Sequence, residues 1–537
     1  MNTTVVYPHS RMANELDMPP GTELMRDATN SQNDEFSDLH QVLVPKPSDD
    51  LEDPLNWSFP RKLVTVIVQA LYVLFSILPT LSIAPVTPIF LEEFHTDEGT
   101  VSLFLGVAVI TLGYMNFILV PFSNIFGRRA TCLITAAIVI GGNIWLALAR
   151  GVGSFLGARV FNAIGAAANE TVMVQVIADI FFLHERGQWM GVYFAAYFFG
   201  CFVGPIIAGN MAQALGWRTF FWLCTGVSSL NFFSLLFFFA ETKYHRGMSS
   251  PDGTEDQNSS TDVKGKDSGI TSAIIEHSSN AKMALGNGRP GRRQWYLIQK
   301  PYPNAVSSLL RDIVTPVFIL GFPIIAWTVF VVEASANTLL AMNLTQSPVF
   351  AAPPYHFTPG QVGFVNFAFV VGGMIGMITA GPLSDWVAKR LTVRNNDVRE
   401  PEMRLWAMVP YFAAMVLGCI VIILGYRNQW PWQAIVVFGY TCIGLQVIAL
   451  PTIAVAYAVD CYKPISGEIL VICTVFKNTV GFSMAYWVQD LTPANAVLVL
   501  FATNAGACLL GIPIYFFGKR LRQFSRNSAV HLMEKVM

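Results

Sequence analysis

The sequence has little charge and lacks the short motifs that identify ATP-driven pumps and many enzymes. Asp, Glu, Lys and Arg make up 13% of its 537 residues, whereas soluble domains carry roughly 25%. It contains no G-x-x-x-x-G-K-[ST] phosphate-binding loop, so ATP does not drive it directly. A metal-ligand helix and a nucleophile elbow are also missing. We therefore expect a protein that is not an enzyme and that uses no cofactor and no metal.

The cysteines and the net charge add two further exclusions. The eight cysteines fall in or beside apolar runs, without metal-ligand spacing and without an exterior pair. They are most simply small packing residues. The formal net charge is −1, and we expect no nucleic-acid partner.

Long apolar runs are what the sequence has in abundance. Hydrophobic residues make up 53% of the chain, and they gather in runs of about 20 residues, enough to cross a hydrocarbon core roughly 30 Å thick. Open strand edges do not survive in lipid, so the runs must be helices. The sequence thus predicts an all-α membrane protein with twelve transmembrane helices and the lipid bilayer as a partner. The predicted spans are 63–90, 100–122, 130–149, 152–178, 189–213, 217–240, 313–341, 360–384, 405–426, 431–456, 466–490 and 494–518.

Basic residues flank alternate loops, whereas an acidic loop at 92–98 lies on the other side. The positive-inside rule therefore places both termini and the long central loop in the cytoplasm. We expect a multi-pass protein of the plasma membrane. The predicted domains are a disordered N-terminus (1–60), a six-helix bundle (61–242), a Ser-, Gly-, Asp- and Lys-rich disordered loop (243–311), a second six-helix bundle (312–518) and a tail (519–537).

One apolar segment carries Gly191, Gly200, Gly204, Pro205 and Gly209 with the spacing G-x8-G-x3-G-P-x2-A-G. Glycines let two helices approach closely in lipid, and a proline bends a helix by removing one backbone hydrogen bond. The pattern resembles the fifth-helix antiporter motif of drug:proton antiporters in the major facilitator superfamily. The alternative is a generic glycine-rich helix interface.

A weak internal repeat supports two related halves, as in many transporters. Both copies resemble the loop motif G-x3-D-R-x-G-R-R of the same superfamily, each degraded differently. The first copy, after the second span, keeps Gly127, Arg128 and Arg129. The second, after the eighth span, keeps Gly381, Asp385, Lys389 and Arg390.

Charges inside a membrane are costly and usually functional. The fourth span carries Arg159 and Glu170, whose spacing of eleven residues puts both on one face of a continuous helix. The stretch around Arg159 resembles the superfamily's fourth-helix motif R-x-x-Q-G-x-G-A, and the resemblance implies a role in proton coupling for Arg159. Because an arginine that comes near a carboxylate in low dielectric favours its ionised form, we expect Glu170 to bind and release the proton. The alternative is a buried ion pair that fixes helix packing.

Several polar residues are predicted to line a substrate cavity. Glu333 and Asn337 are four residues apart on the seventh span, so they share a face. Glu333 suits protons or a cationic substrate; the alternative is solvation by exterior water. The remaining cavity candidates are Asn169, Trp327, Gln446 and Lys477. Asn343 begins an Asn-Leu-Thr sequon in a loop predicted to be exterior, and is therefore a candidate for glycosylation.

The segments 53–58, 184–187 and 241–246, together with Asp179, resemble fungal drug:proton antiporter-1 transporters. This resemblance implies the major facilitator fold and a monomeric, proton-coupled exporter of a small amphipathic compound, such as a drug or a fungal secondary metabolite, with protons as the second partner. An importer of organic cations such as polyamines is the alternative that Glu170 and Glu333 favour. A non-transporting sensor is a third possibility, but the polar segments offer no ordered signalling domain.

The topology yields the first testable prediction. Epitope tags at both termini and within 243–311 should survive protease digestion of sealed, right-side-out vesicles, because basic flanks stay in the cytoplasm. Cleavage of the central loop from outside would contradict this orientation.

Overall fold

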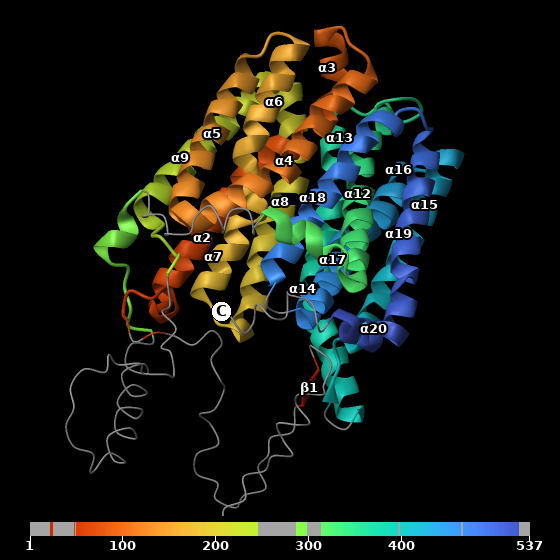
Figure 1. The fold of residues 1–537 in the computed structure, drawn as a ribbon. Coiled ribbons are helices and arrows are strands. Elements are labelled where there is room, and N and C mark those ends of the chain that lie inside the picture. The colour runs from red at the N-terminus through yellow and green to blue at the C-terminus, as the bar shows by residue number, and fades with distance from the viewer. Residues whose placement is uncertain are drawn as a thin grey trace, which may run out of the picture.

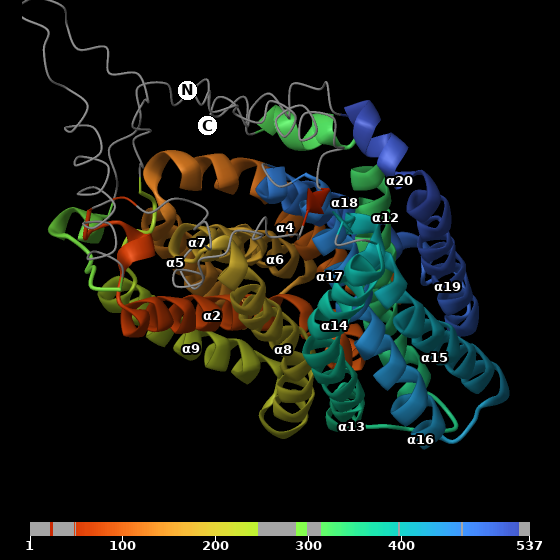
Figure 2. The same ribbon diagram turned by 90° about the horizontal axis from the view of Figure 1, so that it is seen from below.

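The computed structural model describes residues 22–24, 48, 50–244, 286–297, 313–395, 398–462 and 465–525. Among these residues, twelve helical segments are long and apolar enough to cross a membrane, which confirms the number of spans predicted from the sequence. They form two bundles side by side, with the earlier part of the chain in one bundle and the later part in the other (Figures 1 and 2).

The first bundle contains six spans. The first span is interrupted between α2 and α3, and the fourth between α6 and α7. The elements are η1 (Pro54–Asn56), α2 (Phe59–Leu81), η2 (Ala84–Val86), α3 (Thr87–Phe94), α4 (Glu98–Phe126), α5 (Arg128–Leu148), α6 (Val152–Ala166), η3 (Ala167–Glu170), α7 (Val172–Ile180), α8 (Leu183–Leu215) and α9 (Trp217–Phe238).

The second bundle repeats this plan with breaks at other places. A π-helical turn, η6, interrupts its fourth span. The elements are α12 (Pro323–Phe350), α13 (Pro359–Val365), α14 (Phe367–Arg394), η5 (Pro401–Met408), α15 (Val409–Asn428), α16 (Trp432–Ala434), η6 (Ile435–Tyr440), α17 (Thr441–Cys461), α18 (Ser466–Trp487), α19 (Pro493–Leu509) and α20 (Gly511–Ser525).

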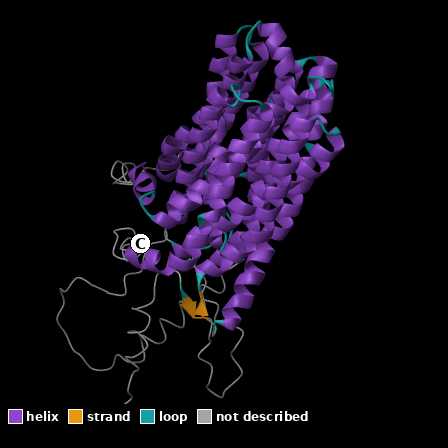
Figure 3. Cartoon of the chain, turned by 90° about the vertical axis from the view of Figure 1, so that its right-hand side faces the viewer, coloured by secondary structure: helices purple, strands orange, loops and turns teal. Residues whose placement is uncertain are grey.

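We call the end of the bundles at which α20 lies the terminal end, and the end at which α3 and α13 lie the opposite end (Figure 1). A two-stranded antiparallel pairing of β1 (Glu23–Leu24) with β2 (Val398–Arg399) lies at the terminal end, where Figure 3 shows the strands in orange beside the lower end of a helix. It joins the segment that precedes the first bundle to a loop of the second.

Polar side chains hold the first span against its neighbours. The hydroxyl of Tyr72 lies 2.8 Å from that of Thr135 on α5, and Asn169 of η3 donates to the hydroxyl of Ser76 over 3.1 Å. Apolar burial does not drive helices together in lipid, because lipid tails are as apolar as the side chains. Hydrogen bonds between helices therefore contribute to their association.

The structure corrects one predicted span. The seventh span was predicted at 313–341, but α12 begins at Pro323 and continues to Phe350. Proline is favoured in the first helical turn, where its missing N–H is not needed. At the other end, the polar residues that suggested a loop are satisfied within the protein: Thr345 donates to the carbonyl of Ala341, and Asn366 donates to Gln346.

Part of the central loop predicted to be disordered has a defined place. Residues 286–297 pack against the segment before α2, where the amide of Gly288 donates to the carbonyl of Asn56 over 2.9 Å. The ring of Trp295 lies 5.1 Å from the guanidinium of Arg61 and 5.1 Å from that of Arg129. Aromatic contact area of this kind offsets the entropy of ordering a loop. The segments 245–285 and 298–312 lie outside the described residues.

Candidate functional site

The fourth span is not a continuous helix, and this positions Glu170. The α-helix α6 ends at Ala166, the tighter 3₁₀ turn η3 follows, and α7 starts at Val172. A 3₁₀ turn rotates the chain by about 120° per residue rather than 100°. The prediction that Arg159 and Glu170 share one face was therefore wrong, since it assumed unbroken helix.

Glu170 instead meets the second bundle. The ammonium of Lys477 on α18 lies 2.8 Å from its Oε1, and Asn478 Nδ2 donates to Oε2 over 3.2 Å. The hydroxyl of Tyr197 on α8 donates to Oε1 over 3.0 Å. We call Glu170, Tyr197, Lys477 and Asn478 the central cluster. It joins the two bundles near the middle of their spans.

The electrostatics of the central cluster depend on its burial. Glu170 is 4% exposed, so its carboxylate relies on these donors rather than on water. Removing one partner of such a buried pair typically costs about 3–5 kcal/mol, because the other charge is left uncompensated. Neutralising both charges costs much less. The cluster therefore contributes to holding the bundles together.

A second carboxylate lies beside the central cluster. Asn337 Nδ2 lies 3.1 Å from Glu333 Oε1 and 3.3 Å from the carbonyl oxygen of Lys477. Glu333 is 5% exposed, and among the described residues no cationic side chain forms an ion pair with it. The structure thus brings together four of the sequence candidates: Glu170, Glu333, Asn337 and Lys477.

Three other cavity candidates lie inside one bundle or the other. Trp327 donates to the carbonyl of Ala507 on α19 over 2.9 Å, and Asn169 is bound to the first span, as described above. Gln446 accepts a hydrogen bond from Asn504 over 3.3 Å. All three contacts are made within a bundle, and the prediction that these side chains line a substrate cavity stays a prediction.

Arg159 forms its hydrogen bonds with backbone carbonyl groups rather than with Glu170. Its guanidinium donates to the carbonyls of Phe104 (2.8 Å) and Pro79 (3.0 Å), and to that of Thr80. The last two carbonyls belong to the final turn of α2, where helix carbonyls have no partner within the helix. Arg159 therefore caps the break in the first span and ties it to α4.

The glycine motif of α8 lies against two different helices. A Cβ at Gly200 would meet Ile77, and one at Gly204 would meet Ser82, both from the first span. A Cβ at Gly209 would meet the carbonyl of Pro359, the first residue of α13 in the second bundle. Pro205 lies within α8 between these contacts. A Cβ at Gly191 would have no neighbouring atom within 4 Å, so close packing does not explain the glycine at this position.

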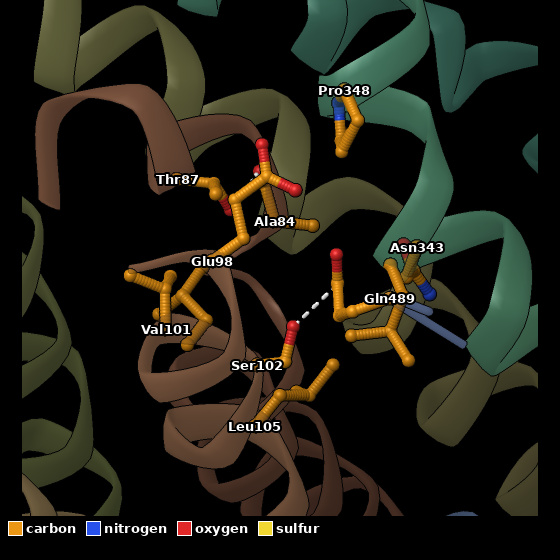
Figure 4. A pocket seen from close by; sticks show the side chains of 11 residues that line it. Ala84, Thr87, Glu98, Val101, Ser102, Leu105, Asn343, Pro348 and Gln489 are labelled. Atoms are coloured by element: carbon orange, nitrogen blue, oxygen red, sulfur yellow. Dashed lines mark hydrogen bonds between the residues drawn. The ribbon is translucent and has the colours of Figure 1, made fainter. Parts of the chain in front are cut away.

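The bundles also meet at the opposite end. Gln489 donates to Ser102 over 2.5 Å, and the amide of Gly360 donates to Gln213 over 3.1 Å. Figure 4 shows a small pocket there, lined among others by Glu98, Ser102, Asn343 and Gln489. Together with the packing of Gly209, these contacts join the two bundles at the opposite end.

Asn343, the predicted glycosylation site, does not lie in an exterior loop. It is a residue of helix α12, it is 6% exposed, and its Oδ1 accepts from Gln346. A buried helical asparagine is a poor acceptor for a glycan, which requires an accessible surface segment. The structure therefore does not support the predicted modification.

The first loop motif forms a charged network at the terminal end. Gly127 has φ 103°, which favours glycine. Arg128 Nε lies 3.0 Å from Asp179 at the end of α7. The amides of Arg128 and Arg129 donate to the two carboxylate oxygens of Glu241, whose pKa burial raises despite these donors.

The second motif forms a related network with different members. Asp385 lies 2.7 Å from Arg404, which also lies 2.6 Å from Asp460 at the end of α17. Asp460 thus occupies the place in the second half that Asp179 holds in the first. Lys389 and Arg390 are exposed, and Gly381 faces no atom within 4 Å.

Sequence reasoning missed three members of these sites. Tyr197 follows Tyr193 by four residues on one face of α8, a spacing that could have marked both as partners of a buried acid. Asn478 is the neighbour of Lys477. Asp460 stands at the end of a span in the second half, where comparison with Asp179 could have found it.

Comparisons with known proteins point in one direction. Residues 69–464 match the family model of the Major Facilitator Superfamily. Protein HOL1 of Saccharomyces cerevisiae is 26% identical over 538 residues, 90% of this chain and 91% of that protein. The MFS antiporter QDR3 of Candida albicans is 21% identical over 571 residues, 90% and 81% of the two chains. The structure of the human organic anion transporter MFSD10 covers 84% of this chain and 99% of its own, with a TM-score of 0.52 and 16% identity, a likeness of fold.

The glycine contacts generate a matched test. Gly204→Leu inserts a side chain where α8 touches the first span, and such overpacking costs roughly 1–3 kcal/mol. We expect a lower melting temperature of the purified protein. Gly191→Leu on the same helix should be close to neutral, because no atom lies within 4 Å of its Cβ position. Equal melting temperatures for the two variants would contradict the packing described for Gly204.

Proposed function

The chain belongs to the Major Facilitator Superfamily, and we propose that it exports a small amphipathic organic compound in exchange for protons, by alternating access between its two bundles. Members of this superfamily move small molecules across membranes and are not enzymes. The proposed site lies between the bundles near the middle of the spans, where transporters of this architecture bind their substrates.

The ion pair between Glu170 and Lys477 is the observation that carries this proposal. It connects the bundles through opposite charges in a medium of low dielectric constant. A proton on Glu170 removes the negative charge and weakens the connection, so the bundles can separate at that point. Proton binding and the change of conformation are coupled through a single carboxylate.

The direction of transport is supported by α8. Its glycines pack against the first span and, at Gly209, against α13 of the second bundle. This packing would seal the opposite end while the site faces the terminal end, and the glycine motif that makes it possible resembles that of drug:proton antiporters. The relative QDR3 is named an antiporter. A proton moving down 100 mV yields roughly 2.3 kcal/mol, and one pH unit adds about 1.4 kcal/mol.

A second candidate function is proton-coupled import of organic cations. It is favoured by Glu333, a buried carboxylate with no cationic partner among the described residues. A cationic substrate would supply the missing charge. In either direction we propose that the protein works as a monomer in the plasma membrane, with the terminal end in the cytoplasm.

The coupling role of Glu170 is tested by Glu170→Gln, which keeps the size of the side chain and removes its negative charge. We expect at least a tenfold loss of transport driven by an imposed pH gradient in proteoliposomes. Glu400→Gln is the matched control, since Glu400 pairs with the half-exposed Lys519 over 3.4 Å and lies away from the site. Wild-type rates with unchanged pH dependence in Glu170→Gln would show that the pair only holds the helices together.

Arg159→Lys tests a separate structural contribution. Lysine lacks the planar fork that reaches three carbonyls, and each hydrogen bond to a charged group contributes about 1.5–3 kcal/mol. We expect a lower melting temperature and a loss of transport. A variant that melts and transports like the wild type would contradict the capping role of Arg159.

The direction is tested in cells. Deletion of the protein should make cells more sensitive to compounds that it exports, measured as survival across a panel of toxins with surface expression followed in parallel. Greater resistance of the deletion strain to a toxic cation would instead support the importer.

A further inference from the structure

Glu170 accepts hydrogen bonds from three donors of different kinds. Lys477 Nζ and the hydroxyl of Tyr197 both approach Oε1, while Asn478 Nδ2 approaches Oε2. The neutral donors come from both bundles, Tyr197 from α8 and Asn478 from α18. They hold the carboxylate in place whichever cation lies against it.

The surroundings of Lys477 are those of a bound ammonium ligand. Its Nζ lies 2.8 Å from the carboxylate, 3.5 Å from the Tyr197 hydroxyl and 5.5 Å from the centre of the Tyr197 ring. A carboxylate and an aromatic face together form a common receptor for organic cations. The Lys477 side chain is 18% exposed, whereas that of Glu170 is 2% exposed, so the cation is the more accessible partner.

The charges around Lys477 do not balance. Glu170 and Glu333 carry two negative charges when ionised, and Lys477 supplies one positive charge. Asn337 Nδ2 contacts both Glu333 and the carbonyl of Lys477, at 3.1 and 3.3 Å. Glu333 therefore lies within the reach of a lysine side chain that starts at position 477. A second carboxylate is available if the ammonium of Lys477 leaves the first.

We propose that Lys477 is a tethered stand-in for a substrate, and that a primary alkylammonium group displaces it from Glu170 while Lys477 moves to Glu333. The exchange leaves two ammonium groups paired with two carboxylates, so both buried acids are neutralised. This inference rests on the proposed transport function and adds its substrate class and binding atom. The site takes a primary ammonium because the group it replaces is one.

Selectivity follows from the same geometry. A primary ammonium donates a hydrogen bond to Glu170 Oε1 at the distance that Lys477 Nζ now holds. A quaternary ammonium has no N–H, and its methyl groups keep the charge farther from the carboxylate. A carboxylate ligand is repelled by both acids. The expected order of binding is hexylammonium, then hexyltrimethylammonium, with hexanoate not bound.

The experiment measures the binding of these three probes to the purified full-length protein by calorimetry at neutral pH. Removing the tethered competitor in Lys477→Gln should tighten the binding of hexylammonium about tenfold, because a site that is occupied by its own lysine most of the time binds ligand in proportion to its free fraction. Glu170→Gln should abolish this binding. Lys519→Gln, at a half-exposed lysine of the surface, is the matched control and should bind like the wild type.

Lys477→Arg keeps the positive charge and guards against a variant that fails to fold. Its guanidinium forms two hydrogen bonds with a carboxylate, so hexylammonium should bind to this variant more weakly than to the wild type. Unchanged or weaker binding in Lys477→Gln with a wild-type melting temperature would overturn the inference. Wild-type binding in a Glu170→Gln variant that has lost proton-driven export would also overturn it, and would leave the proposed function standing.

Discussion

The absence of hydrogen-bonding partners in lipid is the constraint on which the rest of this structure depends. Each backbone or side-chain polar group within the spans needs a partner from the protein. The breaks in the helices illustrate this. Where α2 ends within the first span, its last carbonyls are bound by Arg159. A charged residue from the fourth span thus makes an interruption in the first span tolerable.

The two bundles are joined by two kinds of contact with different properties. At the opposite end, small residues such as Gly209 allow backbone to touch backbone, and this contact does not depend on charge. Near the middle, Glu170 and Lys477 are held by opposite charges, so this contact does depend on charge. In the mechanism that we propose, the first kind of contact provides the seal and the second provides the response to protons.

The two halves carry related charged networks at the terminal end. In the first half, Arg128 reaches Asp179; in the second, Arg404 reaches Asp460 and Asp385. Arg128 is the first residue of α5 and Arg404 lies in η5, yet each ties the start of the third span to the end of the fourth span of its half. The geometry of the network is retained although its members are not, because a buried or half-buried charge needs a partner wherever it stands.

The sequence by itself determined the number of spans, their division into two halves and the presence of costly charges within them, because length and hydropathy depend only on the order of residues. It did not determine which charges meet. The partner of Glu170 lies 307 residues away on another bundle, and a 3₁₀ turn without glycine or proline redirects Glu170 away from Arg159. The sequence around Asn343 predicts an exposed sequon, but the side chain is buried. Burial is possible because neighbouring polar residues of α12 form hydrogen bonds with one another. Such pairings are fixed only when helices pack, since contact in space does not follow from spacing along the chain.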